Sequence, residues 1–312
     1  MFIVNKRKIF YTLSIILAVA SIVAIYVFGL NFGIDFKGGS SVEFQYANER
    51  PSVDVVKSEI DSLSFEPSIK DSYSVVPTGE KGYILNLRTV SEEERSMLTA
   101  VLSGDTSNPV EVKKFNSVGP TLGKEAQRKS MTSVILVILC IVIFLTFAFR
   151  KVSKPVSSWK YGIASIIALC HDVLIPTGIF AVLGHYIPGF EIDTLFVTAI
   201  LVILGFSVHD TIVVFDRVRE NLRNSAGVKN SEEFEKIVGS SISQTFIRSI
   251  NTSLTTLLAV LVVYLVGPES TKHFALALLI GIFFGTYSSI FIGSNLLVTM
   301  EKMQNKKAVA KK

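Results

Sequence analysis

The sequence predicts a helical membrane protein that carries one small α+β domain outside the membrane. Three observations predict this fold class: 49% of the 312 residues are hydrophobic, the chain contains six long apolar stretches, and one long polar segment interrupts them. A spanning helix needs about 20 mostly apolar residues. The expected spans are Ile9–Leu30, Met131–Phe149, Tyr161–Leu183, Thr194–Phe215, Phe246–Val266 and Phe274–Met300.

The first apolar stretch follows three basic residues, Lys6, Arg7 and Lys8, as a signal peptide does. Its apolar run is about 20 residues, whereas a cleavable signal has a run of about 7–15 residues. We therefore expect an uncleaved signal anchor. Cleavage after the small-residue sequence Ala18-Val19-Ala20 stays open as the alternative.

The distribution of lysine and arginine predicts the orientation, because positive residues accumulate in cytoplasmic loops. The short loops at 184–192 and 267–273 hold only Lys272, whereas the loops of the other set are rich in lysine and arginine. Both termini are therefore expected in the cytoplasm and residues 31–128 outside. The net charge of +5 follows from this bias, so it favours contact with membrane lipid and not with nucleic acid.

This topology divides the chain into four parts. Residues 1–30 form the cytoplasmic N-terminus and the first span, 31–128 the exported domain, 129–300 the other five spans, and 301–312 a basic cytoplasmic tail. A mixed-charge amphipathic connector is expected at about 217–243, either with apolar residues such as Phe234 and Val238 at the membrane surface or as a solvated segment with snorkelling arginines.

The exported domain alternates between strand and helix patterns. Period-two alternation predicts strands at Ser40–Tyr46, Ser72–Val76, Tyr83–Val90 and Val110–Phe115. Helical spacing follows the first strand, and a capping box of Ser91 and Glu94 opens a second helix. The order strand, helix, two strands, helix, strand is typical of a ferredoxin-like fold.

Ionisable residues inside the spans are the candidate chemistry, because charges in lipid are costly and often mark ion or proton paths. The third span carries His171 and Asp172, and the fourth carries His209 and Asp210. Two interpretations of Asp210 fit these residues equally well, and in the first it carries a proton, with Arg248 as its cationic partner and His209 as an orienting neighbour. A fixed ion pair between Asp210 and Arg248 is the competing interpretation, and for His171 and Asp172 a hydrogen-bonded packing pair is favoured.

Two further patterns lie on the last three spans. A polar stripe at helical spacing is expected to face protein or water instead of lipid. It comprises Ser241, Gln244, Thr245, Arg248, Asn251, Thr252 and Thr255 on the fifth span, opposite Ser207 and Thr211 on the fourth. A ridge of small residues allows close helix contact, inside this chain or with a partner. Its members are Ala277, Gly281, Gly285, Ser289 and Gly293.

The sequence offers no catalytic triad, no ligand cluster at metal-binding spacing and no nucleotide-binding loop. We therefore expect no enzyme activity, no metal site and no cofactor.

Several motifs give the chain a specific resemblance. Phe32-Gly33-Ile34-Asp35-Phe36-Lys37-Gly38-Gly39-Ser40 after the first span resembles the SecD/SecF family of bacterial export proteins, and so does Gly119-Pro120-Thr121-Leu122-Gly123 before the second. The segment 207–217, His171-Asp172, Gln244-Thr245 and Arg248-Ser249 are similar to the family's later spans. The small exported domain resembles the SecF branch of this family.

The resemblance implies a half-unit of the RND superfamily in the bacterial inner membrane. It implies pairing with SecD, association with the SecYEG channel, with YajC and with a translocating polypeptide, and use of the proton gradient in late steps of protein export. It also implies that Asp210 and Arg248 take part in proton movement. His209 departs from the family's common asparagine, which leaves open whether the coupling ion is proton or sodium. Half of an RND-type small-molecule exporter and a non-transporting scaffold are the alternatives.

Overall fold

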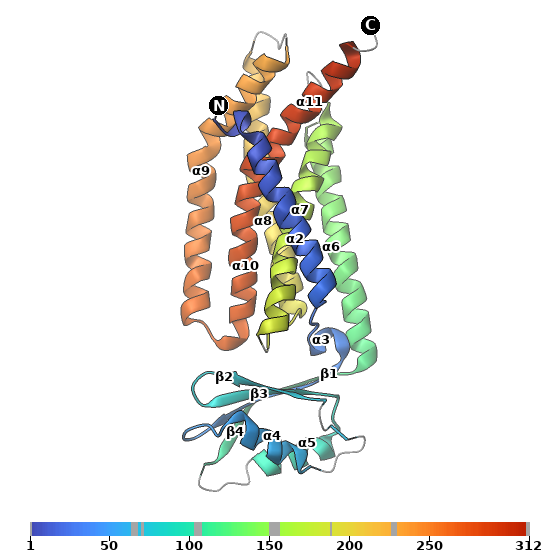
Figure 1. Cartoon of the computed structure of the whole chain (residues 1–312), viewed down its shortest axis with the longest axis vertical. Coiled ribbons are helices and arrows are strands. Elements are labelled where there is room, and N and C mark those ends of the chain that lie inside the picture. Colours follow the sequence, from blue (N-terminus) through green and yellow to red (C-terminus); the bar gives the residue numbers. More distant parts are fainter. Residues whose placement is uncertain are drawn as a thin grey trace. The chain divides into compact units, whose positions relative to one another are not determined.

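The computed structural model describes residues 2–63, 68–69, 72–102, 108–149, 157–187, 189–225 and 230–309. The chain divides into two compact units. Unit 1 comprises Met1–Gly29, Ser133–Val182 and Phe196–Lys312, and it is a helical bundle. Unit 2 comprises Leu30–Thr132 and Leu183–Leu195, and it contains a sheet (Figure 1).

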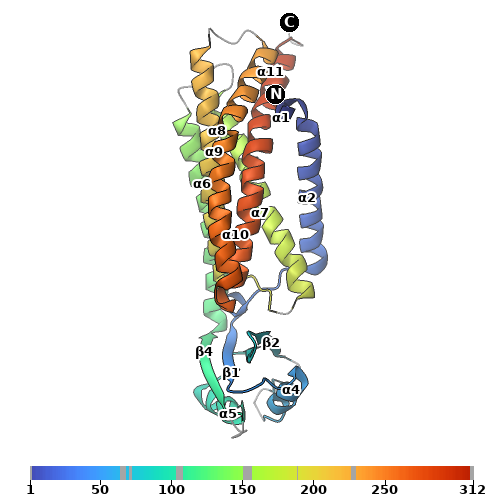
Figure 2. The ribbon, with the colours of Figure 1, turned by 90° about the vertical axis from the view of Figure 1, so that its left-hand side faces the viewer.

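The described residues form six helices that are long and apolar enough to span a membrane, as the sequence predicts. The first five are α2 (Arg7–Phe28), α6 (Pro120–Ala148), α7 (Ser158–Tyr186), α8 (Thr194–Asn224) and α9 (Ser231–Val266). The sixth joins α10 (Glu269–Ser288), a π-helical turn η1 (Ser289–Gly293) and α11 (Ser294–Val309), and a short helix α1 (Phe2–Asn5) precedes the first. Helices α9 and α10 form an antiparallel pair, which both views show (Figures 1 and 2).

Helices α8 and α9 extend through the described part of the range 217–243, for which the sequence predicts an amphipathic connector. The side chain of Asn230 accepts a hydrogen bond from the Glu233 backbone N–H at 2.9 Å and thereby caps the start of α9. Phe234 and Val238 are fully buried in the core of unit 1 instead of lying at a membrane surface. Apolar residues at helical spacing fit a bundle core as well as a membrane surface, so the pattern alone did not separate the two.

One end of unit 1 is held by aromatic packing and by ion pairs. The rings of Phe149 and Tyr161 stack with centroids 5.1 Å apart, and Phe215 packs edge-on against Tyr161 at 5.2 Å. The Glu235 carboxylate on α9 forms ion pairs with both Arg7 of α2 and Lys302 of α11. The aromatic contacts thus join the end of α6 to α7 and α8, and the ion pairs join α9 to α2 and α11.

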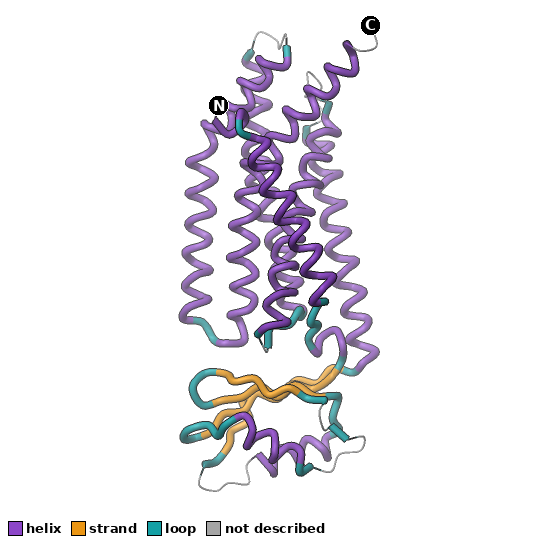
Figure 3. The backbone as a smooth tube through the Cα atoms, viewed as in Figure 1, coloured by secondary structure: helices purple, strands orange, loops and turns teal. Residues whose placement is uncertain are grey.

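Unit 2 has the predicted ferredoxin-like fold. Its strands are β1 (Gly39–Tyr46), β2 (Ser74–Thr78), β3 (Gly82–Leu87) and β4 (Val110–Val118), all antiparallel in the order β2-β3-β1-β4. Helices α4 (Val53–Asp61) and α5 (Glu92–Leu102) cover one face of this sheet (Figure 3). Pro77 lies inside β2, where it is tolerated because β2 is an edge strand.

Two local features fix the backbone of unit 2, and the first of them was predicted from the sequence. The Glu94 carboxylate accepts from the Ser91 N–H at 2.9 Å, and the Ser91 hydroxyl accepts from the Glu94 N–H at 3.2 Å, which is the predicted capping box. A short helix α3 (Ile34–Lys37) precedes β1 and ends at Gly38 and Gly39. Both glycines have positive φ, and a Cβ on Gly39 would lie 2.6 Å from the Leu87 carbonyl oxygen, so only glycine fits there.

Candidate functional site

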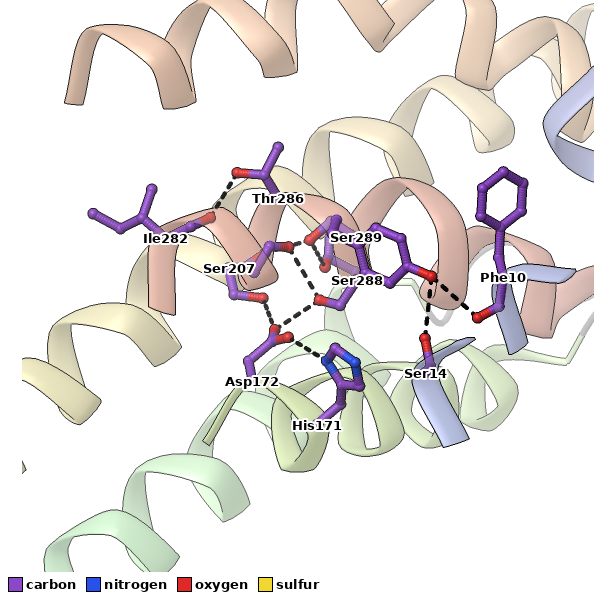
Figure 4. Close-up of polar contacts among 12 residues, drawn as sticks. Phe10, Ser14, His171, Asp172, Ser207, Ile282, Thr286, Ser288 and Ser289 are labelled. Carbon is purple, nitrogen blue, oxygen red and sulfur yellow. Dashed lines mark hydrogen bonds and ion pairs between the residues drawn. The ribbon is translucent and has the colours of Figure 1, made fainter. Parts of the chain in front are cut away.

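Asp172 is the centre of a buried polar cluster in unit 1. Its side chain is completely buried, and its Oδ2 accepts hydrogen bonds from Ser207 of α8 at 2.5 Å and Ser288 of α10 at 2.7 Å. Its Oδ1 lies 3.0 Å from Nδ1 of His171 (Figure 4). Side chains from three spans therefore converge on one carboxyl group.

A second layer of hydroxyl groups holds the first in place. The Ser289 hydroxyl donates to the Ser207 carbonyl oxygen at 3.0 Å (Figure 4). It also lies 2.8 Å from the Thr211 hydroxyl. Ser289 begins the π-helical turn η1, which carries one residue more than an α-helix of the same length. The Ser294 hydroxyl donates to the Ser289 carbonyl oxygen at 3.0 Å and so links the two ends of this turn.

His171 connects this cluster to α2. Its ring stacks on Tyr287 with centroids 6.2 Å apart, and the Tyr287 hydroxyl donates to the Phe10 carbonyl oxygen at 3.0 Å. Ser14 of α2 donates to the same tyrosine hydroxyl at 3.3 Å. Within the described residues, the buried Nε2 of His171 has no hydrogen-bond partner.

Asp210 forms a second, smaller polar contact one turn further along α8. Its carboxyl group is 2% exposed, and its Oδ2 accepts a hydrogen bond from Ser253 of α9 at 3.2 Å. The Thr286 hydroxyl of α10 donates to the Ser253 hydroxyl at 2.6 Å. Both buried carboxyl groups are thus held by hydroxyl groups, and α8 and α10 contribute to both.

The structure does not bring Arg248 to Asp210. Among the residues that the structure describes, no ion pair joins these two side chains, and Arg248 is exposed on the surface of the chain. The side chain of His209, the residue before Asp210 on α8, is also exposed. The expected partnership of Asp210 and Arg248 within one chain is therefore corrected to a contact with Ser253.

The predicted polar stripe on α9 separates into two faces. Ser241, Thr245, Ser249 and Ser253 are buried, and they follow one another at intervals of four residues. Ser249 and Ser253 were missed in the sequence, although this repeat identifies them. The other face is exposed and consists of Gln244, Arg248, Asn251 and Thr255, with Thr252 half-buried between the two faces.

The ridge of small residues lies inside this chain, so the partner alternative for it is not supported. Its residues on α10 and η1 are all buried, and Gly281 and Gly285 pack against α8. A Cβ on Gly281 would lie 2.1 Å from Ile203, and one on Gly285 would lie 3.1 Å from Ser207. The ridge therefore brings α10 close enough to α8 for Ser288 and Ser207 to reach one carboxyl group.

This arrangement suits proton exchange at a buried carboxyl group. A hydroxyl group can donate a hydrogen bond to an ionised carboxylate and can accept one from a protonated carboxyl group. A permanent cation beside the carboxylate would favour the charged form alone. Across the described part of the chain, no group of three or more histidine, cysteine or acidic side chains could hold a metal ion.

Comparison with known proteins places the chain among protein-export proteins. Residues 99–303 match the family described as "Protein export membrane protein SecD/SecF, C-terminal", and residues 23–49 match the "SecD/SecF GG Motif". The chain is 43% identical over 307 residues to the protein translocase subunit SecF of Thermobaculum terrenum, covering 96% of this chain and 93% of the relative. It is 36% identical to SecF of Anaerolinea thermophila, covering 96% and 94%.

Longer relatives are also similar. The chain is 33% identical to the protein translocase subunit SecDF of Bacillus subtilis, covering 97% of this chain and 38% of that protein. The crystal structure of SecDF from Thermus thermophilus, a translocon-associated membrane protein, superposes with a TM-score of 0.81 at 29% identity. That match covers 96% of this chain and 38% of the SecDF chain.

Proposed function

Because the chain belongs to the SecD/SecF family of protein-export membrane proteins, we propose that it is a SecF-like subunit that couples proton movement to late steps of export. An auxiliary role in protein export by a multi-pass protein of the bacterial inner membrane follows from the relatives. The observation that carries the proton-coupling proposal is the pair of buried carboxyl groups, Asp172 and Asp210, each held by hydroxyl groups.

SecD is the proposed partner. In Bacillus subtilis and Thermus thermophilus one SecDF chain contains a region like this one, and that region is only 38% of its length. The exposed polar face of α9 supports the pairing, because Arg248, Asn251 and Gln244 on a spanning helix need protein or water beside them. We propose that SecD covers this face and that Arg248 meets a group of SecD or of the proton path there. SecYEG, YajC and the translocating polypeptide complete the proposed assembly.

The exported position of residues 31–128, with both termini in the cytoplasm, is part of the same proposal. It rests on the bias of lysine and arginine toward one set of loops. In this orientation a proton enters from outside the cell and leaves toward the cytoplasm. Each proton that crosses 100 mV supplies about 2.3 kcal/mol.

Asparagine substitutions test the proposal, because they keep the size and the acceptor oxygen of aspartate and remove its titration. Asp172→Asn and Asp210→Asn should each abolish the stimulation of export by a proton gradient, measured at equal protein abundance in vesicles with SecD and the channel. Asp216→Asn is the matched control on α8, because Asp216 is exposed. Its Oδ1 lies 3.7 Å from an Arg219 guanidinium nitrogen in a surface ion pair. This control variant should leave the stimulation unchanged.

Full gradient stimulation in both asparagine variants would assign the two carboxyl groups to packing and refute proton coupling through them. Export that is stimulated by a sodium gradient and not by a proton gradient would identify sodium as the coupling ion. Export that proceeds normally while a small molecule is transported would instead favour an RND-type exporter.

A further inference from the structure

The loop between α7 and α8 is bound to the segment that follows the first span, and both lie in unit 2. The Ile192 N–H donates to the Asn31 carbonyl oxygen at 2.7 Å, and the Gly33 N–H donates to the Ile192 carbonyl oxygen at 3.0 Å. These two bonds form a parallel bridge between Phe32 and Ile192. The Asn31 side chain donates to the Phe190 carbonyl oxygen at 3.0 Å.

The same segment holds the beginning of α8. The Asp35 Oδ2 accepts hydrogen bonds from the Thr194 N–H at 3.1 Å and from the Thr194 hydroxyl. Thr194 is the first residue of α8, so Asp35 supplies a negative charge and an acceptor where the helix has free N–H groups. The helix that carries Ser207 and Asp210 therefore starts on a residue of the Gly-Ile-Asp-Phe-Lys-Gly-Gly segment.

Glu191 lies inside this contact and beside a cavity. Its Oε1 accepts a hydrogen bond from the Asn86 side chain of β3 at 3.1 Å. A Cβ on Gly33 would lie only 3.0 Å from its Oε2, which shows how closely the backbone covers the carboxyl group. The cavity has a volume of about 380 Å³, and Lys37 and Arg88 also line it.

Several charged groups face Glu191 from the elements around it. Burial raises the pKa of Glu191 to about 7; the Lys37 ammonium of α3 opposes this shift, and the carboxylates of Asp193 and Asp35 add to it. Arg88, which follows β3, lines the cavity but is bound to Glu94. The pKa of Glu191 therefore falls when the loop separates and water reaches the carboxyl group.

We propose that the contact between residues 31–37 and 190–194, which we call the loop clamp, is a pH-dependent latch that is closed when Glu191 is protonated and loosened when Glu191 ionises. This proposal is independent of the proposed function, because it concerns only contacts within unit 2. If residues 31–128 are exported, the latch faces the side from which protons enter.

The direction follows from proton binding. The closed clamp holds the Glu191 proton more tightly than the open loop, in which a glutamate has an ordinary pKa of 4.5. Closure is therefore most favourable below about pH 4.5, weakens as pH rises, and changes no further above about pH 7. One linked proton changes the opening equilibrium by at most about tenfold per pH unit in this window.

Amide hydrogen exchange of the full chain in nanodiscs tests the latch. The amides of Ile192 and Thr194 report clamp opening, because both donate across the contact. After correction for intrinsic exchange, their protection should fall by about fortyfold between pH 5 and pH 7. Glu191→Gln should make the protection nearly independent of pH.

Two control variants separate the latch from other causes. Glu111→Gln changes an exposed carboxylate of β4 and should keep the wild-type pH dependence. Asp35→Asn should lower the protection of Thr194 at every pH while the dependence on pH remains. A flat pH profile in the wild-type protein, or the same slope in Glu191→Gln, would overturn the proposal.

Discussion

Replacing Gly281 by alanine places a methyl group inside the contact between α10 and α8. The new Cβ would lie 2.1 Å from Cδ1 and 2.4 Å from Cγ1 of Ile203, where ordinary contacts begin near 3.4 Å. Ile203 is fully buried, so its side chain cannot turn toward open space. Over-packing of this kind costs about 1–3 kcal/mol.

The comparison variant is Gly205→Ala on α8, where a Cβ would meet nothing within 4 Å. Both variants gain the same helix propensity, about 1 kcal/mol for alanine over glycine. The difference between the two variants therefore isolates packing, and we expect Gly281→Ala to be less stable than Gly205→Ala by about 1–3 kcal/mol. Reversible unfolding by SDS in mixed micelles, followed by circular dichroism, measures this difference.

A second background identifies the clashing residue. Ile203→Ala removes all three side-chain atoms that the new Cβ would approach, so Gly281→Ala should cost less in that background than in the wild type. Equal stability of Gly281→Ala and Gly205→Ala in the wild-type background would show that α10 does not pack on α8 through Gly281.

Two other substitutions test contacts that set the ends of helices. Ser91→Ala removes one half of the capping box with Glu94 and should destabilise unit 2 by about 0.5–2 kcal/mol, measured as faster amide exchange in the first turn of α5. Glu235→Gln leaves Arg7 and Lys302 without their carboxylate and should destabilise unit 1 by about 1–3 kcal/mol in thermal unfolding. This loss is below the 3–5 kcal/mol of fully buried pairs, because the three side chains are 14–33% exposed. An unchanged melting temperature would place this ion pair among the weak surface pairs.

The fold could be predicted from the sequence because each element carries a local signal. Apolar runs of spanning length are visible in the order of the residues, and the capping box of Ser91 and Glu94 marks the start of α5. The extension of α8 and α9 could not be predicted in the same way. Charged residues are compatible with a helix and with a surface connector, and only the burial of Phe234 decides between them.

The carboxyl groups of the candidate site could be predicted from the sequence, but the hydroxyl groups that bind them could not. Asp172 and Asp210 stand out because ionisable residues are rare in spans. Serine and threonine are tolerated throughout membrane helices, so Ser288 gave no comparable signal, and only the four-residue repeat on α9 marks Ser253. The expectation for Arg248 failed within this chain because the same helix offers two polar faces, and tertiary packing alone selects the one that contains Ser253.

The π-helical turn at Ser289–Gly293 gives the sixth span one residue more than its length requires. Such a surplus residue need not stay at one place, because the wide turn can migrate along a helix by exchanging one carbonyl acceptor for the next. Only the residues passed by the turn then rotate, each by about 100°, while both ends of the helix keep their positions. Migration past Ser288 would carry its hydroxyl away from Asp172 and leave Lys302 beside Glu235. Such a migration would change the neighbours of one carboxyl group without any movement of the ends of the span.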